Sequence, residues 1–304
     1  MDEHFAVLMH KLYGFDVRTP MRIVTSWIMD NFDKLWEQTK IQGEFQEKLE
    51  ALGLPPNVVF IDVNGTLFPD DSENGYIPEG DIELFQETLV KAQTKGLSIG
   101  LCSDSPLPQL IDLAKKLGID GPIIAENGNI LYYKDKMVII ESLSDIEKLK
   151  REIAKKAYDS GFIQVGDWIA PEFGGRIDSS NLQWGLGANR ITSITVFGPP
   201  SLIQRLGESF KDGNGFSIDC SPEYNYLAIH PGKDFRSNKG KTLNILSVYG
   251  HNIMMIGNSM SDWVDPEMGV KCVFASESRI NSEISQKAAY ISNKPFIKGV
   301  VDII

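Results

Sequence analysis

Short apolar segments alternate with helical segments in two blocks of the sequence, and this rhythm constrains the fold more than any other feature. The first block is expected to contain, in order, a strand at 58–62, a helix near 80–94, a strand at 97–102, a helix near 107–117 and a strand at 122–125. The second block is expected to contain a helix at 240–249, the strand "IMMIGN", a helix near 262–268, the strand "KCVFA", a helix near 279–287 and the strand "AAYIS". Strands separated by single helices are typical of right-handed parallel β-α-β units. The sequence therefore predicts an α/β fold with a doubly wound parallel sheet.

The segment between the two blocks has a different pattern. It contains a predicted hairpin in "NILYYKDKMVIIE", with a tight turn at Lys134-Asp135, and a charged helix at 144–158. The strand "ITSITVF", a helix at 200–210 and the strands "FSIDC" and "NYLAIH" follow. Because the α/β rhythm resumes afterwards, this α+β module is inserted rather than appended. We expect a core domain made of residues 53–130 and 232–304, and an inserted domain at 131–231.

Residues 1–52 precede the first block and are expected to form a helical extension. In "MRIVTSWIMDNFDKLWEQ", apolar side chains recur at spacings that place them on roughly one face of a helix. Trp27, Phe32 and Trp36 give this segment a sizeable apolar content. We expect it to serve as a surface for a homo-oligomer or for another partner.

The composition of the chain excludes several classes of function. The net charge of -11 argues against a nucleic-acid partner, because phosphates require a basic surface. The apolar runs are far shorter than the ~20 residues of a membrane-spanning helix, and the N-terminus lacks the basic region of a signal peptide. Three widely spaced cysteines among apolar neighbours favour buried free thiols in a reducing compartment. We therefore expect a cytoplasmic protein that acts on a small molecule.

Polar residues follow several of the predicted strands at the point where each strand ends. They are Asp62, Asn64 and Thr66 after the first strand, Ser103 and Asp104 after the second, Lys239 where the returning helix opens, and Asn258 and Asp262 after "IMMIGN". Ligands of parallel α/β sheets bind at the edge where the carboxyl ends of the strands meet. The sequence therefore predicts one site that collects residues from distant parts of the chain.

These residues and their spacing resemble the haloacid dehalogenase-like superfamily. "FIDVNGTL" is similar to its first motif, Asp-x-Asp-Gly-Thr-Leu, and "NKGKTL" and "IGNSMSD" are similar to its third and fourth motifs. "KGLSIGLCSDSPLPQLIDLAKKLGIDGPIIAENGNILY" is similar to the second motif and the segment that follows it, which ends in Asn127-Gly128. The resemblance covers about residues 57–304 and is closer to the Cof-like sugar-phosphatase branch. It implies a Rossmann-like core with a C2-type α/β cap inserted between the second and third motifs.

The resemblance also implies a role for each site residue. Asp62 would attack phosphorus and form an aspartyl-phosphate, which divides one difficult hydrolysis into two easier steps. Ser103 and Lys239 would hold the phosphoryl oxygens, and the catalytic set would be Asp62, Asn64, Ser103 and Lys239. Mg²⁺ would be held by Asp62, the backbone carbonyl of Asn64, Asn258 and Asp262. Substrate contacts would come from Thr66, Ser103, Asp104, Asn127, Arg176 and Arg190, the two arginines gripping a second anionic group of a phosphorylated metabolite.

The chain departs from the family pattern at three positions. Asn64 stands where an acid normally protonates the leaving oxygen, and its absence typically costs ~10²–10⁴-fold in rate. Asn258 stands where an aspartate normally binds Mg²⁺, and a neutral amide oxygen is a weaker ligand for this cation. The usual Thr-Gly-Arg type of step in the second motif is Ser103-Asp104-Ser105 in this chain.

Three functions are compatible with these departures. The first is a slow or specialised phosphatase in which Asp104, a cap residue such as His230, or a good leaving group replaces the missing acid. The second is a catalytically inactive protein with a ligand-binding or scaffolding role. The third is a carbon–halogen or carbon–phosphorus hydrolase, which needs only the Asp62 nucleophile.

Overall fold

The computed structural model describes residues 45–69, 79–168, 183–187, 189–210, 215–232, 238–264, 270–276 and 286–304. The chain divides into two units, Met1–Gly53 and Leu54–Ile304. In the first unit, residues 45–52 are helical. The proposed partner surface at Trp27, Phe32 and Trp36 lies outside the described residues.

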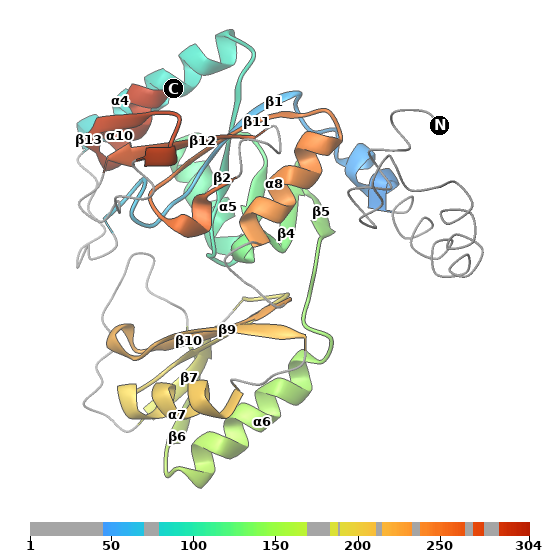
Figure 1. Ribbon diagram of the computed structural model, residues 1–304, viewed down its shortest axis with the longest axis vertical. Helices are drawn as coiled ribbons and strands as arrows, with labels where there is room; N and C mark the ends of the chain where they lie inside the picture. Colours follow the sequence, from blue (N-terminus) through green and yellow to red (C-terminus); the bar gives the residue numbers. More distant parts are fainter. Residues whose placement is uncertain are drawn as a thin grey trace, which may run out of the picture. The chain divides into compact units, whose positions relative to one another are not determined.

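The larger sheet of this unit has eight strands within the described residues, in the order β13-β12-β11-β1-β2-β3-β4-β5. Their bounds are Asn57–Ile61 for β1, Ser98–Cys102 for β2, Ile123–Ala125 for β3, Ile130–Tyr133 for β4, Lys136–Ile139 for β5, Asn252–Gly257 for β11, Lys271–Ser276 for β12 and Ile291–Pro295 for β13. The six strands from β13 to β3 are parallel. This confirms the predicted parallel α/β sheet, with β1 between a strand of the first block and a strand of the second (Figure 1).

Helices bury the apolar strands of this sheet. α4 (Glu79–Thr94), α5 (Leu107–Leu117) and α10 (Phe296–Ile303) contribute to one core cluster with alternate residues of β1. α8 (Asn238–Val248) contacts β11 and buries Leu243 and Leu246. Strands covered by helices read as continuous apolar runs rather than alternating ones, which explains "VVFI" in β1. The helices expected near 262–268 and 279–287 fall largely outside the described residues.

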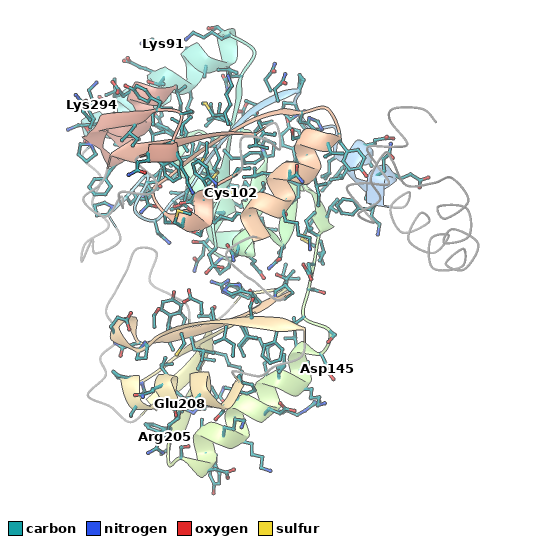
Figure 2. All side chains as sticks on the ribbon, in the orientation of Figure 1. Lys91, Cys102, Asp145, Arg205, Glu208 and Lys294 are labelled. Carbon is teal, nitrogen blue, oxygen red and sulfur yellow. The ribbon has the colours of Figure 1, made fainter. Side chains whose placement is uncertain are left out.

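A second, separate sheet lies between the two blocks, as expected for an inserted cap. Its five strands run in the order β6-β7-β8-β10-β9. Their bounds are Ile163–Trp168, Gln183–Gly187, Ile194–Phe197, Tyr226–Pro231 and Phe216–Ser221, in that order. α6 (Ile146–Asp159) and α7 (Pro200–Phe210) cover one face of this sheet (Figure 1) and share a core with Trp184. Charged side chains of α7, such as Arg205 and Glu208 (labelled in Figure 2), are exposed.

The hairpin at 130–139 differs from the sequence expectation. We expected it within the inserted domain, but β4 pairs antiparallel with β3 and extends the larger sheet. The physical reason is the short 3-10 turn η1 (Glu126–Gly128), which reverses the chain and returns it beside β3. The predicted tight turn is confirmed, because Lys134 and Asp135 both have positive φ, as a type I′ turn requires.

The three cysteines are free, as expected. Cys102 at the end of β2 (Figure 2) and Cys272 in β12 are buried. Cys220 is exposed, so the expectation of burial is wrong for this thiol. Within the part of the chain that the structure describes, no helix is long and apolar enough to cross a membrane.

Candidate active site

Asp62 is placed by the parallel pairing of β1 and β11. Its backbone N–H donates to the carbonyl of Ile256 at 2.8 Å, which continues the β1–β11 ladder by one residue. The chain then turns back, because Leu67 and Phe68 both donate to the carbonyl of Val63. Gly65 lies within this turn with a φ of 77°, a conformation that glycine adopts without strain. The carboxyl group of Asp62 is therefore fixed at the carboxyl edge of the sheet, where only 5% of the residue is exposed.

Lys239 lies between two carboxylates. Its Nζ atom is 2.7 Å from Asp62 Oδ1 and 2.6 Å from Asp262 Oδ1, and all three residues are buried. Burial and then the charge of Asp262 raise the pKa of Asp62, the Lys239 ammonium lowers it, and the net result is a pKa of about 7. Burial alone would lower the pKa of Lys239, but the two carboxylates raise it well above its usual value. Lys239 is therefore a permanent cation at this site.

Asp262 is anchored through its other oxygen. Oδ2 accepts hydrogen bonds from the backbone N–H groups of Asn258 and Ser259, both at 3.1 Å, and from Ser259 Oγ at 3.0 Å. These bonds form a capping box at the start of η4 (Met260–Asp262). Gly257 is required beside it, because a side chain at this position would overlap that of Asp262. Oδ2 of Asp262 thus accepts hydrogen bonds from the turn, and Oδ1 accepts one from Lys239.

Thr66 links the remaining oxygen of Asp62 to Asn258. Its Oγ1 lies 3.3 Å from Asp62 Oδ2 and 3.2 Å from Asn258 Oδ1. A hydroxyl has one hydrogen, so it donates to one of these oxygens at a time. Thr66 is fully buried, which makes it a residue that orients the other two. The two oxygens consequently converge on one point at the edge of the sheet.

This convergence is the feature that suits a divalent cation. Within the described residues there is no group of three or more His, Cys, Asp and Glu placed to hold a metal ion. Asp62 Oδ2 and Asn258 Oδ1 are nevertheless hard oxygen donors, the kind that Mg²⁺ prefers. Asp262 Oδ2 accepts three hydrogen bonds from its own turn, whereas Asp62 Oδ2 faces only the hydroxyl of Thr66, whose one hydrogen it shares with Asn258 Oδ1. The geometry therefore favours Asp62 and Asn258 as ligands and Asp262 as the residue that orients Lys239. The donor set fits Mg²⁺ with a single anionic ligand from the protein.

Asn64 lies on the turn that follows Asp62, and its side chain is exposed. It forms an isolated bridge with Phe68, which places its backbone in the turn rather than in a strand. The structure thus brings Asp62, Thr66, Lys239, Asn258 and Asp262 together by direct contacts, whereas Asn64 borders them on the solvent side.

Ser103 follows β2, which pairs with β1 on the side opposite to β11. Its N–H donates to the carbonyl of Ile124, and its Oγ accepts a hydrogen bond from the N–H of Ser105 at 3.3 Å. The N–H of Asn127 donates to the carbonyl of Ser103, and Asn127 itself is buried with a φ of 59°. The loop at 103–105 is therefore held against the turn that follows β3.

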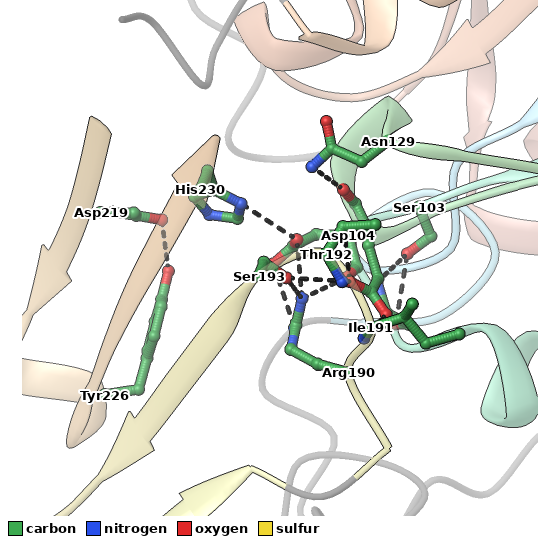
Figure 3. A network of polar contacts seen from close by, with 12 residues as sticks. Ser103, Asp104, Asn129, Arg190, Ile191, Thr192, Ser193, Asp219, Tyr226 and His230 are labelled. Carbon is green, nitrogen blue, oxygen red and sulfur yellow. Dashed lines mark hydrogen bonds and ion pairs between the residues drawn. The ribbon is translucent and has the colours of Figure 1, made fainter. Parts of the chain in front are cut away.

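Arg190 reaches this loop from the inserted domain, as Figure 3 shows. Its Nη1 atom donates to the backbone carbonyl of Asp104 at 2.9 Å and to Oδ1 at 3.2 Å, and its Nη2 atom donates to Oδ2 at 3.4 Å. His230 Nδ1 lies 3.9 Å from the same Oδ1. Desolvation acts to raise the pKa of Asp104, but Arg190 and then His230 lower it below its usual value. Arg190, expected to bind a substrate anion, thus pairs with a carboxylate of the protein, and Arg176 lies outside the described residues.

Glu126 is a site residue that sequence reasoning missed. It is fully buried, and its carboxylate accepts hydrogen bonds from the N–H groups of Ile191 and Thr192 at 2.7 and 2.8 Å. The hydroxyl groups of Thr192 and Ser193 donate to it as well, at 2.6 and 3.1 Å. The sequence does carry a signal for this residue, because Glu126 directly follows the apolar run in "PIIAENGNI". A carboxylate buried at such a position requires hydrogen-bond partners.

Comparison with known proteins decides the family. The sequence model of the haloacid dehalogenase-like hydrolases matches residues 59–263, which is more than half of the chain. The chain belongs to the haloacid dehalogenase-like hydrolase family. The match begins in β1 and ends just after Asp262, so it includes the whole site described above.

Three proteins similar to this haloacid dehalogenase-like hydrolase differ from it in most of their residues. A phosphoglycolate phosphatase of Staphylothermus marinus is 24% identical over 228 residues, which cover 72% of this chain and 85% of the relative. A haloacid dehalogenase-like hydrolase from Bacteroides thetaiotaomicron has a similar structure, with a TM-score of 0.59, 16% identity and coverage of 81% of this chain and 97% of that one. The structure of a sugar phosphatase of subclass IIB of the superfamily is also similar, with a TM-score of 0.51 and 20% identity. The similarity covers 81% of this chain and 97% of that one. These structures share the core with an inserted, separate sheet, as the resemblance implied.

Proposed function

We propose that this protein hydrolyses the phosphate monoester of a small metabolite, with Asp62 as the nucleophile. The observation that carries the proposal is the buried carboxylate of Asp62, held by Lys239 at 2.7 Å at the carboxyl edge of the sheet. The names of distant relatives, phosphoglycolate phosphatase and sugar phosphatase, support the same class of reaction. A phosphorylated sugar or a similarly small alcohol phosphate is the proposed substrate.

The reaction has two steps. In the first, a carboxylate oxygen of Asp62 bonds to phosphorus, and the bond between phosphorus and the alcohol oxygen breaks. The departing alcohol oxygen then takes a proton from solvent water, and the water consumed in the second step returns one. In the second step, water attacks the phosphorus of the aspartyl-phosphate, which releases inorganic phosphate and regenerates the carboxylate. Lys239 neutralises phosphoryl oxygens in both steps, and Ser103 is proposed to donate a hydrogen bond to them.

Mg²⁺ is the cofactor that the site would hold. Asp62, Asn258 and the backbone carbonyl of Asn64 are its proposed ligands, and a bound Mg²⁺ would supply positive charge to the phosphoryl group. The same charge would favour the ionised form of Asp62, whose pKa is otherwise raised by burial. With one anionic ligand from the protein, the affinity for Mg²⁺ is expected to be low.

The source of the proton for the leaving alcohol limits the proposed rate. Asn64 has no proton to exchange at neutral pH, and Asp104 is ionised beside Arg190. His230 is buried, and burial lowers its pKa, so it is neutral at physiological pH. None of the three is suited to act as the acid. We therefore propose slow turnover, with a rate lower by the ~10²–10⁴-fold that a general acid typically contributes. The rate should depend strongly on how readily the alcohol leaves without a proton.

A second candidate is a protein that binds a phosphorylated ligand without turning it over. The amides of Asn64 and Asn258 favour it, because they occupy positions where the family pattern has acids. Both candidates predict phosphate-ligand binding at Asp62 and Lys239. They differ in whether phosphate is released.

Phosphate release from a panel of substrates separates the two candidates. The panel contains sugar phosphates, 2-phosphoglycolate and an activated aryl phosphate, each with and without Mg²⁺. Turnover by the wild type that Asp62→Asn abolishes would support the phosphatase. Silence of the wild type on every substrate, with turnover appearing in an Asn64→Asp/Asn258→Asp double variant, would support the binding protein instead.

A further inference from the structure

The ion pair between Asp104 and Arg190 lies at the edge of the candidate active site. β1 and β2 are paired neighbours, with Ile61 opposite Leu101, so Asp62 and Ser103 emerge from adjacent strand ends. Asp104 is the next residue after Ser103, one position further from the sheet. A ligand whose phosphoryl group lies between Asp62 and Ser103 therefore extends its remaining atoms into the neighbourhood of Asp104.

The two members of the pair are not equally accessible. The side chain of Asp104 is 41% exposed, whereas that of Arg190 is 10% exposed. Three of the hydrogen bonds of the guanidinium go to Asp104 and a fourth goes to Ser193 Oγ at 3.3 Å. A ligand that approaches this pair meets the carboxylate first, with the cation behind it.

The position of Arg190 is fixed by the backbone that follows it. Glu126 accepts hydrogen bonds from three consecutive residues, 191 to 193, through two N–H groups and two hydroxyls. Glu126 in turn follows β3, and its own N–H donates to the carbonyl of Ser105 in the loop that carries Asp104. This closed ring of bonds holds the guanidinium against Asp104.

We infer that Asp104 is a specificity-determining residue, which masks the charge of Arg190 and makes the site select phosphate esters whose remaining part is uncharged. This inference rests on the proposed phosphate-ligand site. A second anionic group, such as the carboxylate of 2-phosphoglycolate, would meet the Asp104 carboxylate and be repelled. A hydroxyl group at the same place would instead donate a hydrogen bond to it. The selected class is therefore the phosphates of neutral polyols and sugars, in contrast to the substrate named for the curated relatives.

The test compares two ligands that differ only at the second group. 2-Phosphoglycolate carries a carboxylate where 2-hydroxyethyl phosphate carries a hydroxymethyl group. Their dissociation constants are measured by calorimetry in an Asp62→Asn background at fixed low salt. Turnover cannot interfere in this background, so the comparison stands even if the protein is not a phosphatase.

The expected result is a reversal of preference on removal of one charge. The parent protein should bind 2-hydroxyethyl phosphate more tightly. Asp104→Asn keeps the carbonyl acceptor for Arg190 and unmasks the charge of the guanidinium. The affinity for 2-phosphoglycolate relative to that for 2-hydroxyethyl phosphate should rise by roughly ten- to a hundredfold, as expected for a hydrogen bond to a charged group. Adding Arg190→Gln should remove that shift.

Asp112→Asn is the matched control. It removes the same charge from an exposed position of α5, and it should leave the ratio unchanged. The inference is overturned if Asp104→Asn leaves the ratio of dissociation constants unchanged, or if Asp112→Asn shifts it equally. It is also overturned if the shift persists when Arg190 is replaced. The failure of both ligands to bind would overturn it as well, because the inference places Asp104 beside a phosphate ligand.

Discussion

At the scale of single residues, the site is defined by a cation that two buried carboxylates share. Lys239 has two ion-pair partners, and each carboxylate has further hydrogen bonds that hold it in place. Buried charges persist in proteins only when they are paired in this way. The arrangement therefore couples the stability of the fold to the chemistry of the site, and both can be tested through the same side chains.

Replacement of Lys239 should cost stability as well as function. Lys239→Met leaves two buried carboxylates without their cation, which is expected to destabilise the fold by ~3–5 kcal/mol and to abolish phosphate-ligand binding. Urea denaturation and ligand titration measure the two effects. Lys241→Met is the control, because Lys241 forms an ion pair with Glu141 at the surface, where its side chain is 53% exposed. Equal losses in the two variants would contradict the assigned role of Lys239.

The raised pKa of Asp62 predicts how stability depends on pH. The pKa is about 7 in the folded protein against an ordinary value of 3.8, so the folded chain holds the proton more tightly than the unfolded chain. The contribution of this group is fully present below about pH 4 and is lost as the pH rises towards 7. Asp62→Asn should remove this loss and be more stable than the wild type at pH 8. Denaturation of both proteins at pH 5 and pH 8, without Mg²⁺, measures the difference in their free energies of unfolding. A difference that is the same at both pH values would argue against the raised pKa.

At the scale of elements, two turns connect the strands to the site. η4 presents Asp262 to Lys239, and η1 presents Glu126 to residues 191–193 of the inserted domain. In each turn a carboxylate accepts several backbone or hydroxyl donors, which orients the chain without a long helix. Changes in these turns should affect geometry more than they affect apolar packing.

Gly257 is predicted to be intolerant of any side chain. Gly257→Ala would push against Asp262, and relief requires movement of η4 or of β11, at a cost of about 1–3 kcal/mol. Ligand affinity should fall with it, since Lys239 loses an oriented partner. Gly80→Ala in α4 is the control, because a Cβ there meets nothing within 4 Å and alanine favours a helix. Thermal denaturation and ligand titration distinguish the two glycines.

Glu126 is predicted to hold residues 191–193 in place. Glu126→Ala removes the acceptor of two backbone N–H groups and two hydroxyls, and it should cost about 3 kcal/mol. Amide hydrogen exchange should accelerate at Ile191 and Thr192 first, because their N–H groups lose their partner. Glu147→Ala removes an exposed glutamate that pairs with Lys150 and should change little. Unaltered exchange at both amides in Glu126→Ala would refute the assignment.

At the scale of the whole molecule, the parallel sheet was predictable from apolar periodicity, and its site from residues at strand ends. Asp62, Lys239 and Asp262 do meet, because the carboxyl ends of neighbouring parallel strands share an edge. The sequence places the hairpin of β4 and β5 in the inserted domain, whereas β4 pairs with β3 of the larger sheet, because the residues of a strand carry no mark of its partner. The contacts of Glu126 and of Arg190 are not predictable for a related reason, because the residues that they join are distant in the chain. Two of the groups that Glu126 binds are also backbone N–H groups, which every residue except proline carries.

The place of β1 in the sheet has a consequence for biosynthesis. One neighbour of β1 is β2, which follows it closely, but the other is β11, where Asn57 pairs with Asn252 only after the whole inserted domain has been made. Until β11 leaves the ribosome, one edge of β1 has no strand to pair with, and an open edge invites pairing with other chains. Prompt folding of the inserted domain would bring residues 231 and 140 near each other and so shorten the search for that edge.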